Sequence, residues 1–446
     1  MSLTAENVRN LGGRISGADT SVRARTDLDN LGGLIEGVDS AAATAGRDVN
    51  FTSTTRDSQS AQGARTGVGR VAAIHVSGPA ATLLIAAARD VNLNAAQVVH
   101  SGQGGSTTIA AGNNLNLGTV TETSRQGIVW DGRNFRNDTT RTEVGTSIQG
   151  SGNIGLSAGT DVNARGANVT STLGAIGVDA GRNINLNAAQ ANVTVDEGHQ
   201  STGSNSLFSR KTITTRDTLD ATTSQATTLS GNTAVLQGGL AGSGDINVRG
   251  SNVVSSQGTT LLAPGNINLE SATDSRLETH SREERKSGIF SSGGFGLTIG
   301  SQRQSVDTTG ARTFAAPSTV GSTDASVGLF AGNAFNQIGS NVTAPAGDVD
   351  IAAKSVVIRE AQETSRDTRD TRFSQSGLTL SITSPVLSAI ETTQQMRAAS
   401  RQTQDGRLQA LAGATSALSV ANAASAISAG AGSSNVATQA GGVSIS

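Results

Sequence analysis

Residues 183–186, Asn-Ile-Asn-Leu, are one copy of a pattern that recurs along the chain: Asp or Asn, an apolar residue, Asn, and a second apolar residue. The other copies begin at Asp48, Asp90, Asn114, Asp161, Asp245, Asn266 and Asp348, and only the last departs from the pattern, with Asp350 at its third position. Alternation of apolar and polar residues with a period of two predicts short β-strands. The copies at Asp245 and Asn266 lie 21 residues apart, and those at Asp90 and Asn114 lie 24 apart.

A shorter repeat stands at the N-terminus, where Asn10-Leu11-Gly12-Gly13 returns 20 residues later as Asn30-Leu31-Gly32-Gly33. A unit of this length holds about three short strands with their turns, which is too short for a propeller blade of about 40 residues. It also lacks the leucine pattern of leucine-rich repeats. Stacking such units in register predicts an all-β fold, a right-handed parallel β-helix with rungs of about 20–24 residues.

The pattern also predicts what the stacked rungs share. Its two apolar positions should form buried columns, including Val349 and Ile351 in the last copy. The Asn at the third position can form a ladder in which each amide donates to its neighbour, although simple solvation of these side chains is the alternative. The expected ladder residues are Asn50, Asn92, Asn116, Asn163, Asn185, Asn247 and Asn268.

Long gaps between copies predict β-hairpin excursions from the β-helix. Three of these segments share a polar opening, at Glu122, Glu278 and Glu363, and then become apolar. The resulting division is residues 1–44 for the first rungs, 45–365 for the repeat region with excursions near 121–149, 196–240 and 273–335, 366–400 for a last excursion and cap, and 401–446 for an Ala/Ser/Gly-rich segment. In that last segment, Leu408, Leu411 and Leu418 have helical spacing and predict a short α-helical tract before a flexible tail. A membrane-active helix is the alternative for this tract, which has no cationic face.

The ten aromatic residues are unevenly placed. Phe51 falls in an expected core column, whereas we expect the other nine in or beside the excursions. Such side chains either fasten a hairpin to its scaffold or anchor a binding partner. The candidates for partner binding are Trp130, Phe135, Phe208, Phe290 and Phe295.

Composition argues against several classes of function. The chain has no Cys and a formal net charge of −2, so neither a disulfide scaffold nor a nucleic-acid-binding surface is expected. The four His are far apart in sequence, the most apolar stretch is too interrupted to span a membrane, and no phosphate-binding loop occurs. We therefore expect no catalytic residue, metal or cofactor. A β-helical polysaccharide-active enzyme is the remote alternative, and it requires carboxylates converging on one outer face.

The segment Ala180-Gly181-Arg182-Asn183-Ile184-Asn185-Leu186 and its copies resemble the haemagglutinin repeats of bacterial filamentous haemagglutinins. The Asn-Leu-Gly-Gly units resemble a shorter repeat class of the same proteins, and residues 288–296 resemble excursion-bearing repeats. Similar repeats occur in contact-dependent growth inhibition exoproteins. The resemblance covers roughly residues 5–380.

The resemblance implies a structural stalk and adhesin segment of an exoprotein from a two-partner secretion system. It implies a dedicated outer-membrane transporter as partner, a location outside the cell or on its surface, and an unknown receptor on a host or neighbouring cell. The alternative is the stalk of a growth-inhibition toxin that presents a C-terminal effector. The first residues, MSLTAENVRN, lack the apolar core of a signal peptide, and neither a secretion domain nor a toxin domain is evident, so we expect an internal or truncated piece.

Overall fold

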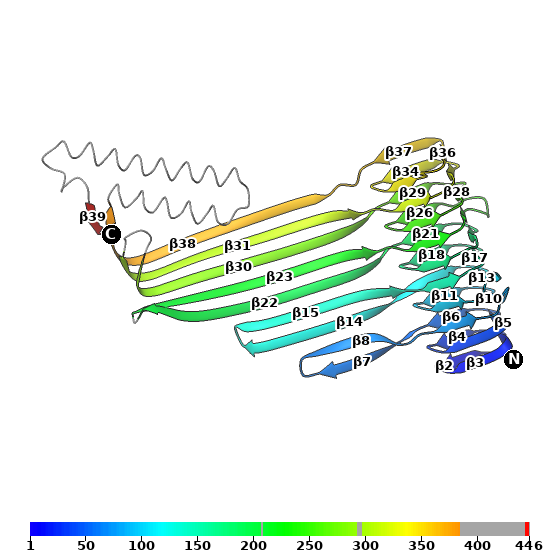
Figure 1. The fold of residues 1–446 in the computed structure, drawn as a ribbon, viewed down its shortest axis with the longest axis horizontal. Coiled ribbons are helices and arrows are strands. Elements are labelled where there is room, and N and C mark those ends of the chain that lie inside the picture. The colour runs from blue at the N-terminus through cyan, green and yellow to red at the C-terminus, as the bar shows by residue number, and fades with distance from the viewer. Residues whose placement is uncertain (207, 292–296, 384–441, 446) are drawn as a thin grey trace. The chain divides into compact units, whose positions relative to one another are not determined.

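The computed structural model describes residues 1–206, 208–291, 297–383 and 442–445, which form strands β1 to β39 and no helix (Figure 1). The α-helical tract expected within 401–446 lies outside the described residues, as does Phe295. The chain divides into two compact units: unit 1, Met1–Glu197, Thr218–Glu278 and Thr309–Asp367, and unit 2, Gly198–Asp217, Thr279–Thr308 and Thr368–Ser446.

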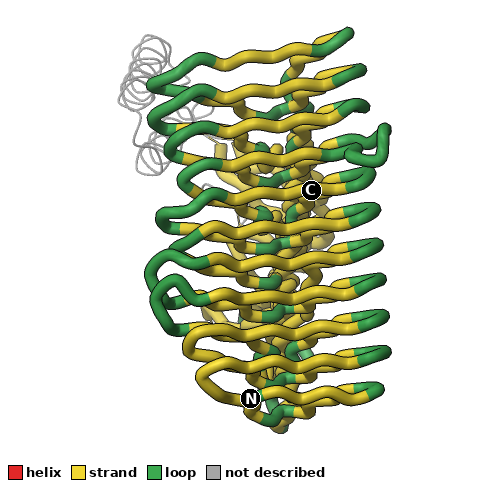
Figure 2. The backbone as a smooth tube through the Cα atoms, turned by 90° about the vertical axis from the view of Figure 1, so that its right-hand side faces the viewer, coloured by secondary structure: helices red, strands yellow, loops and turns green. Residues whose placement is uncertain are grey.

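Unit 1 contains coils of parallel strands stacked in three faces (Figure 2). The first face contains β2 (Val8–Leu11), β4 (Leu28–Leu31), β6 (Val49–Thr52), β11 (Val91–Asn94), the start of β14 (Leu115–Asp131), β18 (Val162–Arg165), β21 (Ile184–Asn187), β26 (Ile246–Arg249), β29 (Ile267–Glu270), β34 (Ala334–Ile338) and β37 (Ser355–Arg359). The second contains the starts of β3 (Arg14–Ala24) and β5 (Leu34–Ala45), then β9 (Ala73–Val76), β12 (Gln97–His100), β16 (Ser147–Gly150), β19 (Asn168–Ser171), β24 (Thr228–Gly231), β27 (Asn252–Ser255), β32 (Thr319–Ser322) and β35 (Asn341–Thr343). The third contains β1 (Ser2–Ala5), the ends of β3 and β5, then β10 (Thr82–Ala87), β13 (Ser106–Ala111), β17 (Asn153–Ala158), β20 (Ile176–Ala180), β25 (Ala234–Gln237), β28 (Thr259–Ala263), β33 (Val327–Ala331) and β36 (Val349–Ala352). This is the parallel β-helix that the repeat predicts.

The core is built from columns of equivalent residues. On the first face Val91 pairs with Leu115 and Leu93 pairs with Leu117, and all four side chains are at most 2% exposed. Burying each such side chain contributes about 1.5–3 kcal/mol. Because every coil repeats the same apolar positions, the stabilisation is a sum of contacts between neighbouring coils.

The sequence interpretation was wrong about the last copy of the pattern. Strand β36 lies on the third face, where Val349 pairs with Val327, and does not continue the first face. That place belongs to β34, in which Phe335 pairs with Ile267 and is 0% exposed. Phe335 is therefore a core residue and not part of an excursion. Apolar alternation suits every face of the coil, so it does not by itself say which face a strand joins.

The excursions of the described chain all leave at one corner, between the first and second faces. They are the strand pairs β7 (Thr54–Ser60) with β8 (Gly63–Arg70), β14 with β15 (Asn134–Gly145), β22 (Ala189–Ser206) with β23 (Ser209–Gln225), and β30 (Ala272–Ser291) with β31 (Leu297–Ala316), followed by the strand β38 (Thr364–Thr383), which pairs with β39 (Gly442–Ile445). They follow β6, the start of β14, β21, β29 and β37, which is every second strand of the first face. The sequence analysis did not predict the β7–β8 hairpin.

Neighbouring excursions also pair with one another, β8 with β14, β15 with β22, β23 with β30 and β31 with β38. We call β7, β8, β14, β15, β22, β23, β30, β31 and β38 the hairpin sheet. A hairpin is two strands wide, about 9.6 Å, and two stacked coils rise by the same distance. Excursions at alternate coils therefore meet edge to edge and leave no gap between them.

Coils that carry no hairpin turn at this corner through one residue in the left-handed backbone conformation. The positive φ angles are 66° at Gly12, 61° at Gly32, 49° at Ala95, 57° at Gly166, 55° at Gly250 and 54° at Gly339. A Cβ added to Gly166 would lie 2.4 Å from the Cβ of Ala189, the first residue of β22. At Gly166 the turn of one coil thus packs directly against the base of the next hairpin, and a larger residue at this position would be strained.

Candidate functional site

The polar residues of the repeated pattern hold the coils together. At its first position, the Asp90 carboxylate accepts the backbone N–H of Asn114 at 3.0 Å, and the Asp161 carboxylate accepts that of Asn183 at 3.0 Å. At its third position, each amide Nδ2 donates to the oxygen of the preceding coil at 2.7–2.9 Å. The donors are Asn50 to Asp29, Asn92 to Asn50, Asn116 to Asn92, Asn163 to Asn116, Asn185 to Asn163, Asn247 to Asn185, Asn268 to Asn247 and Asn336 to Asn268. This face of the coil is occupied by its own hydrogen bonds.

Arginine side chains reinforce the corner between the third and first faces, just before the first-face strands. The Arg182 guanidinium donates to both carboxylate oxygens of Asp161 at 3.0 and 2.6 Å, and Arg89 binds Asp48 in the same two-pronged way. The hydrogen bond from Arg182 holds the pKa of Asp161 below its ordinary value, against the opposing effect of burial. The Asp161 carboxylate is thus ionised, and both carboxylates are paired with an arginine of the next coil. The recurring Gly-Arg before the pattern, as in Gly181-Arg182, was the available sequence signal for them.

The aromatic candidates occupy unlike environments. Trp130 is 60% exposed at the end of the β14–β15 hairpin, beside Val129 at 69%. Phe135 is half-buried on β15, in register with Val129. In unit 2, Phe208 is 71% exposed, whereas Phe290 is only 8% exposed. Among the described candidates, Trp130 and Phe208 therefore have the most exposed side chains.

The turn before β15 fixes the position of Trp130. The Asp131 carboxylate accepts the backbone N–H groups of Arg133 and Asn134 at 2.8 and 2.9 Å, and the Asn134 amide donates to it at 2.7 Å. These hydrogen bonds lower the pKa of Asp131, and the bond from the Asn134 side chain has the largest effect. A carboxylate that accepts several hydrogen bonds holds such a turn closed. The exposed apolar tip is therefore presented by an ordered turn.

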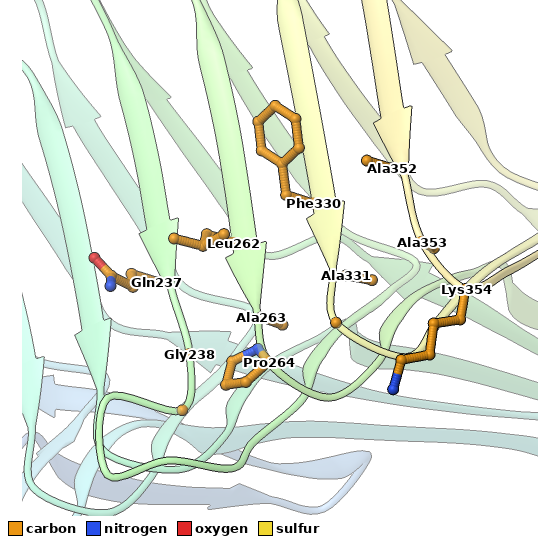
Figure 3. Close-up of a pocket in the computed structure, with 12 residues that line it drawn as sticks. Gln237, Gly238, Leu262, Ala263, Pro264, Phe330, Ala331, Ala352, Ala353 and Lys354 are labelled. Carbon is orange, nitrogen blue, oxygen red and sulfur yellow. The ribbon is translucent and has the colours of Figure 1, made fainter.

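The coil itself has an apolar groove of about 580 Å³ on its third face (Figure 3). Leu262 and Phe330 stand in register on neighbouring strands and are 41% and 38% exposed. The Phe330 ring lies against Gly328, where an added Cβ would come within 2.7 Å of a ring carbon. This contact shows that the ring covers the strand backbone, so Phe330 packs on the outside of the coil.

Chemical sites of other kinds do not emerge from the described residues. No cluster of three or more His, Asp or Glu side chains among them is arranged to hold a metal ion. His280 Nδ1 lies 2.9 Å from the exposed Asp217 carboxylate, and Glu283 and Glu284 are engaged by basic side chains. Within the same residues there is no helix with the length and apolar character to cross a bilayer.

Comparison with known proteins agrees with the geometry of the coil. The family profile described as hemagglutinin repeat matches residues 66–203 and 208–377. The chain belongs to the hemagglutinin-repeat family. This confirms the resemblance drawn from the repeated pattern, and the matched ranges include both coil strands and excursions.

The chain is also similar in sequence to parts of three known proteins. It is 30% identical to the 16S rRNA endonuclease CdiA of Enterobacter cloacae over 62% of this chain, and 27% identical to the tRNA nuclease CdiA-2 of Burkholderia pseudomallei over 80%. It is 35% identical to the deoxyribonuclease CdiA of Yersinia pseudotuberculosis over 39% of this chain. The matched regions cover only 8%, 11% and 16% of those relatives. No solved structure is significantly similar to this chain.

The matches and the fold together define the chain's role in outline. It is a haemagglutinin-repeat stalk segment of the kind found in filamentous-haemagglutinin-like exoproteins, and its repeats have a structural role. The first face of the coil is committed to the Asn ladder, and exposed apolar side chains occur both on the hairpins, as at Trp130, and on the third face of the coil, as at Phe330.

Proposed function

We propose that this segment is the stalk of a secreted adhesin, and that its hairpin sheet is the surface that contacts another cell. The observation that carries the proposal is that excursions leave the coil at one corner at every second coil and pair into one sheet. A coil that served only as a spacer needs no such sheet. The segment acts by geometry and binding, without catalysis.

The proposal includes export and partners. A dedicated outer-membrane transporter delivers the larger exoprotein to the cell surface, and a receptor on the contacted cell binds the hairpins. The membership in the hemagglutinin-repeat family supports this assignment. The long coil of parallel strands, with contacts only between neighbouring coils, is suited to folding progressively as the chain emerges.

The second candidate is the stalk of a contact-dependent growth inhibition toxin. It is favoured by relatives named as nucleases, of which the matched regions cover 8–16%. In that case the same stalk and hairpins position an effector at a target cell. The two candidates differ in what the contact delivers, not in what this segment does.

The test begins at the tip of the β14–β15 hairpin. In register, Gly127 pairs with Asn137, so residues 128–136 can be replaced by Asn-Gly while the remaining pairs are kept. We expect the full exoprotein with this change, or with Trp130→Ala, to bind target cells less well. Leu84→Ser, at a residue 36% exposed on the coil, is the matched control and should leave adhesion unchanged.

The outcome separates the candidates. Undiminished adhesion by both hairpin variants contradicts a contact role for this tip. If adhesion is lost together with killing of neighbouring bacteria, the segment serves toxin delivery. If adhesion is lost and no killing is associated with the exoprotein, the adhesin assignment holds.

A further inference from the structure

Unit 2 contains a polar groove of about 450 Å³ formed by strands β23, β30, β31 and β38. Arg210, Arg285 and Arg303 contribute cationic side chains to it, whereas Lys286 follows Arg285 on β30 and its side chain points to the opposite face of the sheet. No acidic residue is among the described residues that line the groove. Basic side chains from three strands thus converge on one depression. Convergence from separate strands sets this groove apart from a run of charges along a single solvated strand.

One neighbouring carboxylate, that of Glu283, lies on the same sheet face and does not neutralise these cations. Glu283 is shared by Arg285 and Arg303, with Arg303 at 2.6 Å. On the opposite face of the sheet, Glu284 is shared by Lys211 at 3.1 Å and Lys286 at 3.2 Å, and also lies 3.4 Å from Arg282. Burial opposes ionisation, but the hydrogen bonds from the basic side chains lower the pKa of both Glu283 and Glu284. Each carboxylate therefore carries one charge against at least two cations.

Arg210 has no ion pair within the described part of the chain, although it lines the same groove. Its guanidinium offers a planar set of N–H donors that fits the oxygens of a carboxylate, sulfate or phosphate group. The local excess of positive charge stands in a chain whose formal net charge is −2. It is a local feature and not the result of a basic composition.

Hydroxyl groups complete the lining. They come from Thr212, Ser287, Ser301, Ser374 and Ser376, and the Ser301 and Ser376 hydroxyls lie 2.9 Å apart across two strands. Hydroxyl and guanidinium donors around one depression suit a ligand that carries both oxyanions and sugar hydroxyls.

A second groove, in unit 1, repeats this chemistry. It has a volume of about 290 Å³ and lies between β7, β8 and β14. Arg65 and Arg125 line it together with Ser58, Ser60 and Ser124, and none of its described lining residues is acidic. Two sites with the same chemistry favour a polymer with repeated anionic groups over a single small anion.

We propose that the unit 2 groove binds the oxyanion groups of an acidic polysaccharide on the contacted cell. The inference rests on the proposed function and names the ligand class of the hairpin sheet. Arg210 and Arg303 hold the sulfate, phosphate or carboxylate oxygens, and the serine and threonine hydroxyls bind the sugar hydroxyls. No covalent step is involved.

The test measures binding of the full chain to immobilised dextran sulfate, polygalacturonate and neutral dextran. We expect binding to both acidic polymers, little to neutral dextran, and weaker binding as salt concentration rises. Arg210→Gln combined with Arg303→Gln should weaken binding by about tenfold, the value of one lost charge-assisted hydrogen bond. Arg372→Gln is the control, because Arg372 is paired with Asp370 in the same unit and does not line the groove.

Several results overturn the inference. Equal binding to neutral dextran does so, as does unchanged affinity of the double variant. Because Arg210 has no ion pair with any described residue, we expect Arg210→Gln alone to fold like the parent, and this variant should lose threefold or more in binding. Competition by inorganic phosphate as effective as that of the polymer shows a small-anion site and also refutes a polysaccharide ligand. Loss of polymer binding without loss of cell adhesion, by contrast, leaves the groove assignment standing and counts against the proposed function alone.

Discussion

The corner turn at Gly166 is the sharpest test of how coil and hairpins fit together. In Gly166→Ala, the new Cβ would lie 2.4 Å from the Cβ of Ala189, and the residue would hold a φ of 57°. A non-Gly residue in the left-handed region costs about 1–2 kcal/mol. Overpacking at such a contact adds about 1–3 kcal/mol. We therefore expect the substitution to lower the free energy of unfolding by about 2–5 kcal/mol.

Gly155→Ala is the matched control. Gly155 lies within β17, its φ is not in the left-handed region, and an added Cβ meets no atom within 4 Å. Gly in a strand interior costs about 0.5–1 kcal/mol relative to Ala, so this variant should be as stable as the parent or slightly more stable. Any effect on the unfolded chain is common to both substitutions.

Amide hydrogen exchange is the suitable measurement, because a stacked coil opens locally and not as one unit. Gly166→Ala should speed exchange mainly in β18, β19, β21 and the base of β22, which surround the turn. Urea unfolding followed by circular dichroism gives the overall loss. Equal stability of the Gly166→Ala and Gly155→Ala variants would refute the view that the turn of one coil supports the next hairpin.

Three further predictions concern the interior and the ladders. Asn163 donates to Asn116 and accepts from Asn185, so Asn163→Ala should lower the unfolding free energy by about 1–3 kcal/mol, and a melting temperature equal to that of the parent contradicts this. His100 is 3% exposed, both its ring nitrogens lack hydrogen-bond partners, and burial lowers its pKa. The unfolded chain therefore binds more protons at this residue than the folded chain does. Because of this difference, the free energy of unfolding should fall as the pH drops below about 6.5. His100→Leu should reduce this slope in melting curves between pH 5 and 7.5, and identical slopes would exclude the effect. Arg182 lowers the pKa of Asp161, and this ion pair contributes at most about 1 kcal/mol to the free energy of unfolding. The contribution should be present above the unfolded-state pKa near 3.9 and vanish as the pH falls through the lower folded-state pKa. In an acid titration, the Arg182→Gln variant should lack this pH-dependent loss of stability.

The hairpins and the exposure of their aromatic residues could be predicted only in part from the local sequence. The β7–β8 hairpin is short and lacks the Glu-Thr opening of later excursions, so residues 54–70 gave no distinct signal. Trp130 and Phe290 were equally plausible as contact residues, yet they are 60% and 8% exposed. Exposure depends on which strands lie alongside, and a neighbouring strand in this sheet comes from a different excursion.

The sequence by itself determined the coil. Its alternation of period two and its recurrence every 20–24 residues specify strands whose apolar columns are buried by stacking on the next copy. Both signals can be read from the chain itself, because one lies within a single strand and the other between consecutive copies. Only the tertiary structure decided which face each strand joins, that Phe335 belongs to the core, and that the hairpins pair into a sheet. The physical reason is that these outcomes depend on contacts between segments distant in sequence. The hairpins pair into a sheet, for example, because the width of a two-stranded hairpin equals the rise of two stacked coils.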